Sequence, residues 1–384
     1  MKLLAFSNTD WYLYNYRMPI DNLLKGKGYE VVMVSPPGPY VAKLKAAGFR
    51  WLEISMSRSG MNVMNEVETI RQIAEIYKSE RPDIVHHFTI KCNLYGGIAA
   101  KLAKVPIVVD SIAGLGYIYA SSALKARMLR PMCNNWYKFA MRNSKVIFQN
   151  PDDLYNFTHR RFVREKNAFL IKSSGVDLSK FTPQPFPDTE PVVLLASRML
   201  WTKGIREFVE AARMIKRTRP GVRFLLVGKP DPGNPASISE KQMQAWENEG
   251  AVQWLGFRED MPELINNAHV VCFPSKHTEG TPKFLVEAAA AGRPIITTKN
   301  RGCKEVVVEE ENGLLVPKGN ANALAQAITT IVSDRTLMEK MGKRSRTLAE
   351  NEFALRKVAE QTHQIYQAAI EEKIHESVLT PVPA

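Results

Sequence analysis

The chain has 384 residues, of which 45% are hydrophobic and 24% charged, and its formal net charge is +13. This balance is typical of an ordinary globular protein and excludes wholesale disorder, a collagen-like fibre and a polytopic membrane protein. The length favours two domains of roughly 100–200 residues, each large enough to bury its own core.

The cysteines and the N-terminal segment indicate the compartment. Four cysteines, none in a Cys-x-x-Cys pair, argue against a disulfide scaffold or a zinc site and favour a reducing environment. The apolar run in the first seven residues is too short for a signal-peptide core and predicts a buried strand. No stretch approaches the roughly 18 consecutive apolar residues of a spanning helix. We therefore expect a cytoplasmic protein.

Apolar runs alternate with amphipathic segments along most of the chain. The strands expected in the first half are 2–7, 30–35, 83–87, 106–110, 146–149 and 168–172. Those expected in the second half are 192–196, 223–227, 252–254, 270–273, 294–298 and 313–316. Because helices are expected between the strands, the pattern predicts two doubly wound parallel sheets with helices on both faces.

The seam between the two halves is a proline-rich segment. Residues 182–191 hold four prolines, which favours a stiff extended linker. A long helical stretch is expected over 320–374, and a tail over 377–384 is expected to be disordered. Ligands are expected in a cleft between the two domains.

The positive charge is concentrated in the first half. Residues 1–175 carry 25 basic and 13 acidic side chains, so almost all of the surplus lies there. The segment 117–145 holds six basic residues, no acidic residue, and the aromatic side chains of Trp136, Tyr137 and Phe139. This segment is a solvated helix face, or it binds an anionic membrane surface or nucleic acid.

The strongest motif is the segment 277–288, which follows the strand at 270–273 and opens a helix predicted over 281–291. Gly280 permits close approach of the backbone, and Pro282 suits the first helical position. Amides at such a helix start form an anion site with the help of the helix dipole. The amides expected to do so here are those of Thr281, Lys283 and Phe284.

Two glutamates flank this helix start. Glu279 precedes the helix and Glu287 lies about two turns into it, so one carboxylate can reach a ligand at the helix mouth while the other lies deeper. The alternative makes Glu279 a complement to the helix dipole and Glu287 a surface residue.

A second motif is the loop 196–204, at the first strand-to-helix turn of the second half. Arg198 and Lys203 flank this turn, where a doubly wound sheet presents ligands. Two cations on one loop suit a diphosphate, although on their own they would be ordinary solvated charges.

Other cofactor signals are weak. The chain has no Asp-x-Asp, no Walker-type phosphate loop and no Gly-x-Gly-x-x-Gly. His86 and His87 end a strand and point to opposite faces, so at most one can face a ligand. No metal and no resident cofactor are therefore expected.

Together these motifs resemble the retaining nucleotide-sugar glycosyltransferases of family 4. The resemblance rests on Ser197-Arg198-x4-Lys203-Gly204, Leu226-Val-Gly228, Leu255-Gly256-Phe-Arg258, Pro274-Ser275-x3-Glu279-Gly280-x6-Glu287-Ala288, and Ser174-Gly175-Val176-Asp177-x3-Phe181. In the first half, Tyr16-Arg-Met-Pro-Ile20 and Gly114-Leu-Gly116 resemble the branch that extends lipid-linked oligosaccharides or exopolysaccharides.

The resemblance implies a GT-B fold and a role for each motif. Arg198 and Lys203 would hold the donor diphosphate, Glu279 would bind hydroxyls of the transferred sugar, and Glu287 would accept from the ribose hydroxyls. The phosphate and sugar would rest on Gly280, Thr281, Pro282, Lys283 and Phe284. Gly256 and Arg258 would border the base. The C-terminal helix would cross back to the first domain.

Two departures from the family pattern concern the first half. Many members carry a glycine pair after the first strand. In this chain residues 7–11, at the same place, are Ser-Asn-Thr-Asp-Trp. Many also have a histidine after the fifth strand, and Ala113 replaces it here. This departure argues against a histidine-assisted mechanism and favours deprotonation of the acceptor hydroxyl by the donor phosphate itself.

The sequence thus predicts an acceptor-binding domain over 1–182, a nucleotide-sugar domain over 183–352, a returning helix over 353–376 and a tail over 377–384. We expect transfer of a hexose or N-acetylhexosamine from a UDP-sugar to a polyprenyl-diphosphate-linked saccharide, at an anionic membrane surface on the cytoplasmic side. The alternatives are a nucleotide-sugar epimerase on the same fold and a basic nucleic-acid-binding protein. The second lacks a visible base-stacking module.

Overall fold

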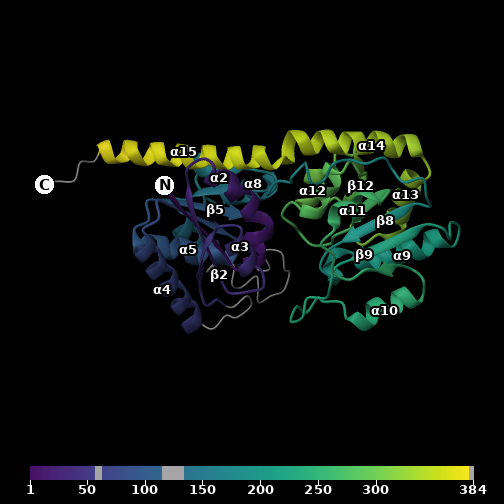
Figure 1. Cartoon of the computed structure of the whole chain (residues 1–384), viewed down its shortest axis with the longest axis horizontal. Helices are drawn as coiled ribbons and strands as arrows, with labels where there is room; N and C mark the ends of the chain where they lie inside the picture. The colour runs from purple at the N-terminus through teal and green to yellow at the C-terminus, as the bar shows by residue number, and fades with distance from the viewer. Residues whose placement is uncertain (57–62, 115–133, 380–384) are drawn as a thin grey trace. The chain divides into compact units, whose positions relative to one another are not determined.

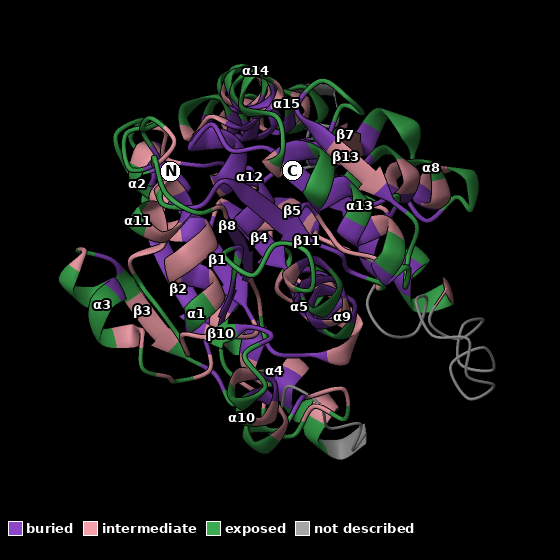
Figure 2. Ribbon diagram, turned by 90° about the vertical axis from the view of Figure 1, so that its right-hand side faces the viewer, coloured by how far each residue is buried: buried purple, intermediate pink, exposed green. Residues whose placement is uncertain are grey.

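The chain forms two compact units. The computed structural model describes residues 1–56, 63–114 and 134–379. The first unit comprises Met1–Gly175 and Leu355–Ala384, and the second comprises Val176–Ala354 (Figure 1). Each unit contains one parallel sheet covered by helices, as the alternating pattern predicts. The central strands of each sheet are buried, and the helices that cover the sheets turn exposed faces outward (Figure 2).

The first unit contains a seven-stranded parallel sheet in the order β3-β2-β1-β4-β5-β6-β7. Its strands are β1 (Lys2–Ser7), β2 (Glu30–Ser35), β3 (Arg50–Glu53), β4 (Ile84–Phe88), β5 (Ile107–Ile112), β6 (Lys145–Phe148) and β7 (Ala168–Leu170). Only β3 was not expected. It pairs with β2 at the edge of the sheet, and its first and last residues are exposed, so it lacks the apolar run that marks the other strands.

Helices complete the first unit. The described helices are α1 (Asp10–Tyr12), the π-helix η1 (Leu13–Arg17), α2 (Met18–Lys25), α3 (Val41–Ala46), α4 (Val63–Glu80), α5 (Ile90–Ala103), α8 (Pro151–His159), η2 (Glu165–Asn167) and α15 (Leu355–Leu379). A further helical stretch covers 134–141. Residues 57–62 and 115–133, which include part of the basic segment and Gly116, lie outside the described residues.

The C-terminal helix α15 belongs to the core of the first unit. It packs against α2 and buries a row of apolar side chains there, among them Val358, Ile365 and Tyr366. The Tyr366 hydroxyl lies 2.6 Å from His86 Nδ1. The expected return of the C-terminal helix is confirmed. However, α15 continues to Leu379, so residues 377–379, which were expected in a disordered tail, belong to the helix.

Both histidines at the end of β4 are internal. His86 Nε2 lies 2.7 Å from Ser111 Oγ, and His87 contacts Asp110 at 2.7 Å and the Tyr77 hydroxyl at 2.9 Å. Neither has exposed surface, and burial holds the pKa of His86 well below its ordinary value. Both histidines are therefore structural, and His86 is neutral.

The second unit contains a six-stranded parallel sheet in the order β10-β9-β8-β11-β12-β13. Its strands are β8 (Val192–Ala196), β9 (Arg223–Val227), β10 (Gln253–Trp254), β11 (Val270–Phe273), β12 (Ile295–Thr298) and β13 (Gly313–Val316). Its helices are η3 (Trp201–Lys203), α9 (Ile205–Lys216), α10 (Glu240–Asn248), α11 (Met261–Asn266), α12 (Lys283–Ala290), η4 (Cys303–Val306), α13 (Ala321–Val332), α14 (Arg335–Leu348) and the π-helix η5 (Ala349–Phe353). The long helical stretch expected over 320–374 is thus divided into α13, α14, η5 and α15.

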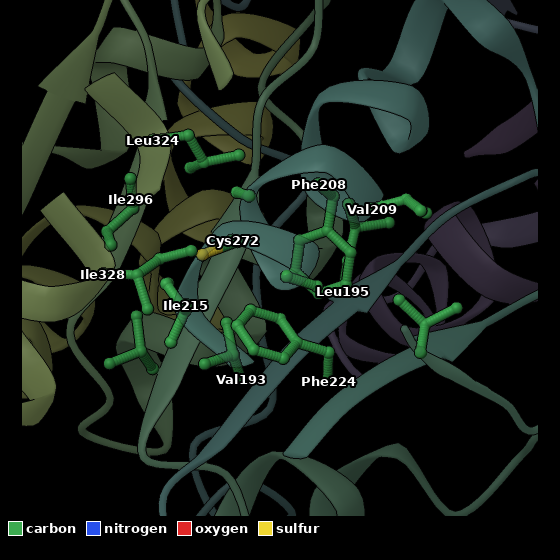
Figure 3. Packing of buried hydrophobic residues seen from close by; sticks show 14 of the residues in the cluster. Val193, Leu195, Phe208, Val209, Ile215, Phe224, Cys272, Ile296, Leu324 and Ile328 are labelled. Carbon is green, nitrogen blue, oxygen red and sulfur yellow. The ribbon is translucent and has the colours of Figure 1, made fainter. Parts of the chain in front are cut away.

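The core of the second unit forms where α9 packs on the central strands. Phe208 and Ile215 of α9 meet Val193 and Phe224 from β8 and β9 (Figure 3). The Phe208 and Phe224 rings lie edge to face with centroids 5.5 Å apart. Burying such side chains contributes roughly 1.5–3 kcal/mol each, so this face of the sheet is a rigid support for the loops at its ends.

The boundary between the units lies slightly earlier than the proline-rich seam. Val176 N–H donates to Phe353 O at 2.8 Å, and Phe181 is buried in the core of the second unit. The proline segment then runs along this unit, where Arg293 donates to the Gln184 carbonyl at 3.0 Å. Among the described residues, no helix is long and apolar enough to span a bilayer.

Candidate active site

The candidate site lies where the strand order of the second sheet reverses. β8 and β11 are neighbours in the sheet but not in sequence, and ligands of doubly wound proteins bind outside the carboxyl ends of such strands. The loop after β8 and the loop after β11 are joined by a hydrogen bond from Lys276 N–H to Thr202 O at 2.9 Å. Gly204 has φ +76°, and a Cβ there would overlap the Pro274 carbonyl. The two loops therefore approach as closely as a glycine allows.

The structure brings Lys203 and Glu279 together. Lys203 Nζ lies 2.5 Å from Glu279 Oε1, and the two side chains are only 12% and 16% exposed. The Ser275 hydroxyl donates to the same oxygen at 2.7 Å. A cation and a carboxylate thus lie side by side, largely out of water, with one from each loop. Both residues were predicted from the sequence as site residues, but the ion pair between them was not.

Residues at the end of β12 and directly after it hold the Glu279 loop in place. Thr298 Oγ1 donates to the Ser275 carbonyl at 2.6 Å, and Asn300 Nδ2 donates to the His277 carbonyl. Gly302 has φ +77°, and a Cβ there would overlap the Gly280 carbonyl oxygen. Sequence analysis missed these residues. The only signal was a polar run with a glycine directly after an apolar strand.

Helix α12 starts behind this loop, two residues later than expected. It spans Lys283–Ala290, and Pro282 is its N-cap, with ψ 123°, rather than its first helical residue. The first amide to bond back onto Pro282 O is that of Leu285, at 3.1 Å. The amide of Phe284 therefore precedes the hydrogen-bonded part of the helix, at the positive end of its dipole. This end suits a phosphate group.

Glu287 is largely buried, with a small part of its side chain exposed. Its side chain is 13% exposed, and Lys283 Nζ lies 3.7 Å from its Oε1. Burial raises the pKa of the Glu287 carboxyl above its ordinary value, and the Lys283 ammonium opposes that shift. The structure thereby contradicts the surface alternative for Glu287.

Arg198 is placed differently from Lys203. Its side chain is 55% exposed, and its guanidinium donates to Asp231 Oδ2 at 2.7 Å. Asp231 follows β9, and sequence analysis did not identify it. Among the described residues, Arg198 pairs with Asp231 and Lys203 pairs with Glu279. The two cations of the loop after β8 are therefore held by different carboxylates.

The loop after β10 lies beside the end of β9. Gly256 has φ +65°, and its carbonyl accepts from Gly228 N–H at 2.7 Å. Arg258 forms a forked ion pair with Asp260. Between them, Phe257 is 50% exposed, with the Lys229 ammonium 5.4 Å from its ring centroid. An exposed ring beside a cation suits a flat, negatively charged ligand, and Phe257 lies between the two residues that the resemblance implies beside the base.

Comparison with known proteins identifies the class of molecule. The family described as "Glycosyl transferases group 1" matches residues 178–348, and the family "Glycosyl transferase 4-like" matches residues 2–150. The N,N'-diacetylbacillosaminyl-diphospho-undecaprenol alpha-1,3-N-acetylgalactosaminyltransferase of Campylobacter jejuni is 31% identical over 357 residues, which cover 89% of this chain and 92% of that protein. The chain belongs to the family 4 glycosyltransferases.

Two further matches are with a second curated relative and with a solved structure. The UDP-Gal:alpha-D-GlcNAc-diphosphoundecaprenol alpha-1,3-galactosyltransferase of Escherichia coli is 24% identical, over 80% of each chain. The crystal structure of Anabaena Alr3699/HepE in complex with UDP and glucose superimposes with a TM-score of 0.79 at 19% identity, covering 96% of this chain and 99% of that one. The GT-B fold is therefore confirmed. These matches give no support to the epimerase and nucleic-acid-binding alternatives.

Activity of this glycosyltransferase is expected to survive metal removal. Over the described ranges, no group of three His, Cys, Asp or Glu side chains is arranged to hold a metal ion, and the chain has no Asp-x-Asp. Lys203 and the start of α12 offer positive charge in place of a metal. We expect sugar transfer in excess EDTA to match the untreated rate. Loss of transfer that Mg²⁺ or Mn²⁺ restores would contradict this prediction.

Proposed function

We propose that this glycosyltransferase moves a hexose or N-acetylhexosamine from a UDP-sugar to a polyprenyl-diphosphate-linked saccharide, with retention at the anomeric carbon. The observation that carries the proposal is the Lys203–Glu279 pair at the switch point, beside the positive end of α12. It offers a cation for a departing diphosphate and a carboxylate for sugar hydroxyls within one small region. The acceptor class is supported by the Campylobacter jejuni and Escherichia coli relatives, whose names specify undecaprenyl-diphosphate-linked substrates.

Each site residue has a role in this proposal. Arg198 and Lys203 hold the diphosphate, and Glu279 accepts hydrogen bonds from the transferred sugar. The segment Gly280, Thr281, Pro282, Lys283 and Phe284 supports the phosphate and sugar. Glu287 accepts from the ribose hydroxyls, and Gly256 and Arg258 border the uracil, with the exposed ring of Phe257 available for stacking.

The chemistry follows from charge. As the bond from the anomeric carbon to the phosphate oxygen breaks, negative charge grows on the diphosphate, where Lys203 and the α12 amides are already oriented. The acceptor hydroxyl attacks the same face of the sugar. Its proton passes to the departing phosphate oxygen, so the reaction yields a new glycosidic bond and UDP without a separate base.

Transfer assays test the proposal. Purified protein is incubated with UDP-galactose, UDP-glucose and their N-acetylated forms, together with a polyprenyl-diphosphate disaccharide, and the product is analysed by mass spectrometry and NMR. We expect one new sugar per acceptor, α-linked, and release of UDP. A β-linked product would contradict retention. Epimerised donor without transfer would show that the epimerase alternative is correct.

Glu287 is expected to affect donor binding rather than turnover. A glutamine there keeps the shape but weakens acceptance from the ribose, so Glu287→Gln should raise the donor KM several-fold with nearly unchanged kcat. Because burial raises the pKa of Glu287, folding disfavours the ionised form of its carboxyl group. This carboxylate therefore lowers the stability of the fold as the pH rises above the ordinary pKa of glutamate.

The melting temperature of the same variant tests whether burial or the Lys283 ammonium dominates the pKa shift of Glu287. Glu287→Gln should melt at or above the wild-type temperature in neutral buffer, and the difference should shrink in mildly acidic buffer. A lower melting temperature at neutral pH would mean that the Lys283 partner outweighs burial.

We also propose that the first unit binds an anionic membrane surface on the cytoplasmic side, where such acceptors are anchored. Residues 134–145 are the described part of the basic segment, and there Trp136 and Phe139 are 45% and 57% exposed. Tyr137, in contrast, is buried against Phe157 and Phe162, so its expected contact with a membrane is wrong.

Vesicle sedimentation tests this surface. The protein should bind phosphatidylglycerol vesicles, less so at high salt, because charge attraction is screened while aromatic insertion is not. Replacing Trp136 and Phe139 by alanine should remove the salt-resistant fraction. The control is Tyr155→Ala, which removes an aromatic side chain that is 63% exposed in the same unit. Equal loss in both variants would contradict the assignment.

A further inference from the structure

The first unit contains a pocket at the other edge of its sheet. The pocket has a volume of about 310 Å³ and includes Ile107 and Lys145, the first residues of β5 and β6, together with the last turns of α15. In a parallel sheet all amino ends lie at one edge, and ligands of the known fold bind at the opposite, carboxyl edge. The proposed transfer reaction therefore does not use this pocket.

Positive charge dominates the lining of this pocket. Its six cationic residues are Lys101, Lys104, Lys145, Arg164, Lys166 and Lys373, and its two carboxylates are Glu372 and Glu376. Glu372 contacts both Lys145 and Lys166, and Glu376 lies 3.2 Å from Lys373. Half of the cations are thereby compensated within the lining.

The other three cations have no carboxylate partner among the residues that the structure describes. Across the described parts of the chain, Lys101, Lys104 and Arg164 form no ion pair, and Lys101 instead lies 4.0 Å above the Phe139 ring. Burial lowers the pKa of Lys101, the neighbouring Arg142 charge lowers it further, and the Asp110 carboxylate opposes this shift. An anion in the pocket would relieve this crowding of like charges.

Complementing a helix dipole accounts for only part of this lining. Lys101 and Lys104 lie at the C-terminal end of α5, where cations stabilise the last turn without any ligand. Arg164 precedes η2, and Lys145 is the first residue of β6, so neither side chain complements the dipole at the C-terminal end of α5. The side chain of Lys145 is 11% exposed and is held by Asn167 Oδ1 at 2.9 Å. Cations from separate elements thus converge on one cavity.

We propose that this pocket binds a phosphate-bearing group, a phosphomonoester or a diphosphate. Its volume lies at the small end of the range of roughly 300–1,000 Å³ for ligand pockets, which suits a compact anion. Lysine and arginine both bind phosphate well, the first as a point charge and the second as a planar fork. The group belongs either to a lipid headgroup, since the exposed Phe139 stacks on Lys101, or to a soluble phosphate.

Binding measurements on the full chain test the pocket. The test variant is Lys104→Gln with Arg164→Gln. The control is Lys78→Gln with Arg81→Gln, which removes the same charge from the end of α4 in the same unit. In one arm, pyrophosphate is titrated calorimetrically with UDP present in excess, so that a donor site is already filled. In the other arm, vesicles of phosphatidic acid in phosphatidylcholine are sedimented with each variant.

The expected result is a loss of at least roughly tenfold in affinity for the test variant in one of the two arms, while the control binds as wild type does. A loss in the pyrophosphate arm identifies a soluble ligand, and a loss confined to vesicles identifies a headgroup. Equal binding by both variants in both arms would overturn the proposal. The single variant Arg164→Gln, at an exposed position, repeats the test if the double variant folds poorly. Because transfer activity is not measured, the result stands apart from the proposed function.

Discussion

Replacing Lys203 by alanine is expected to lower turnover by roughly 10²–10³-fold, the cost of removing one preoriented transition-state donor. The ammonium is held 2.5 Å from Glu279 Oε1 and is only 12% exposed, so its charge acts with little screening by water. The neighbouring amides of α12 remain in the variant, which is why we expect residual activity rather than none. Single-turnover kinetics with saturating donor measure the effect directly.

The control for this variant is a cation in the adjoining helix. Arg206 is paired with Glu210 at 2.8 Å, but its side chain is 66% exposed, so Arg206→Ala should leave turnover within a few-fold of wild type. Lys203→Ala also leaves Glu279 without its cation, so the folded fraction must be measured alongside. A fully folded Lys203→Ala enzyme with near wild-type turnover would contradict the diphosphate role.

Gly302→Ala should produce a comparable loss of turnover at a position that touches no substrate in our proposal. A Cβ there overlaps the Gly280 carbonyl, so the loop that positions Glu279 must move away. A displacement of about 1 Å in a catalytic geometry can cost roughly 10²-fold. We expect kcat, measured at a saturating donor concentration, to fall by about that factor.

Gly250 separates loop displacement from backbone strain. Its φ of +71° resembles the +77° of Gly302, but a Cβ at Gly250 would meet nothing within 4 Å. Gly250→Ala should therefore cost about 1–2 kcal/mol of stability through φ alone and leave kcat unchanged. Equal kinetic effects in the two variants would show that strain, and not the Glu279 loop, explains the loss.

The sheets could be predicted from the sequence because their signal is local. Buried parallel strands are short apolar runs, and all of the strands except the edge strands β3 and β10 carry one. The edge strand β3 owes its existence to pairing with β2, which is a contact between segments that local composition does not encode. The same holds for the division at Gly175, where Val176 bonds to a residue far along the chain.

The candidate site could be predicted only in part. The sequence identified the cations of one loop and the glutamates of another, because those residue types near strand ends suit phosphate and sugar chemistry. It could not reveal that Glu279 holds Lys203 while Asp231 holds Arg198, since each pair joins residues on different loops. Supporting residues such as Asn300 and Gly302 act through backbone contacts, for which residue type alone is a weak guide.

The place of α15 in the first unit has a consequence for biosynthesis. The second unit is a contiguous insertion: the chain enters it at Val176 and leaves it at Ala354. It can thus acquire its full set of contacts from one uninterrupted stretch of chain that does not include α15. The first unit, although its strands emerge earlier, waits for the apolar side chains of α15 to close its core. Domains commonly fold in the order in which they are made, and here completion runs in the reverse order. Until then the incomplete first unit exposes an apolar groove, so ribosome stalling between Ala354 and Leu379 should favour aggregation or chaperone capture of the nascent chain.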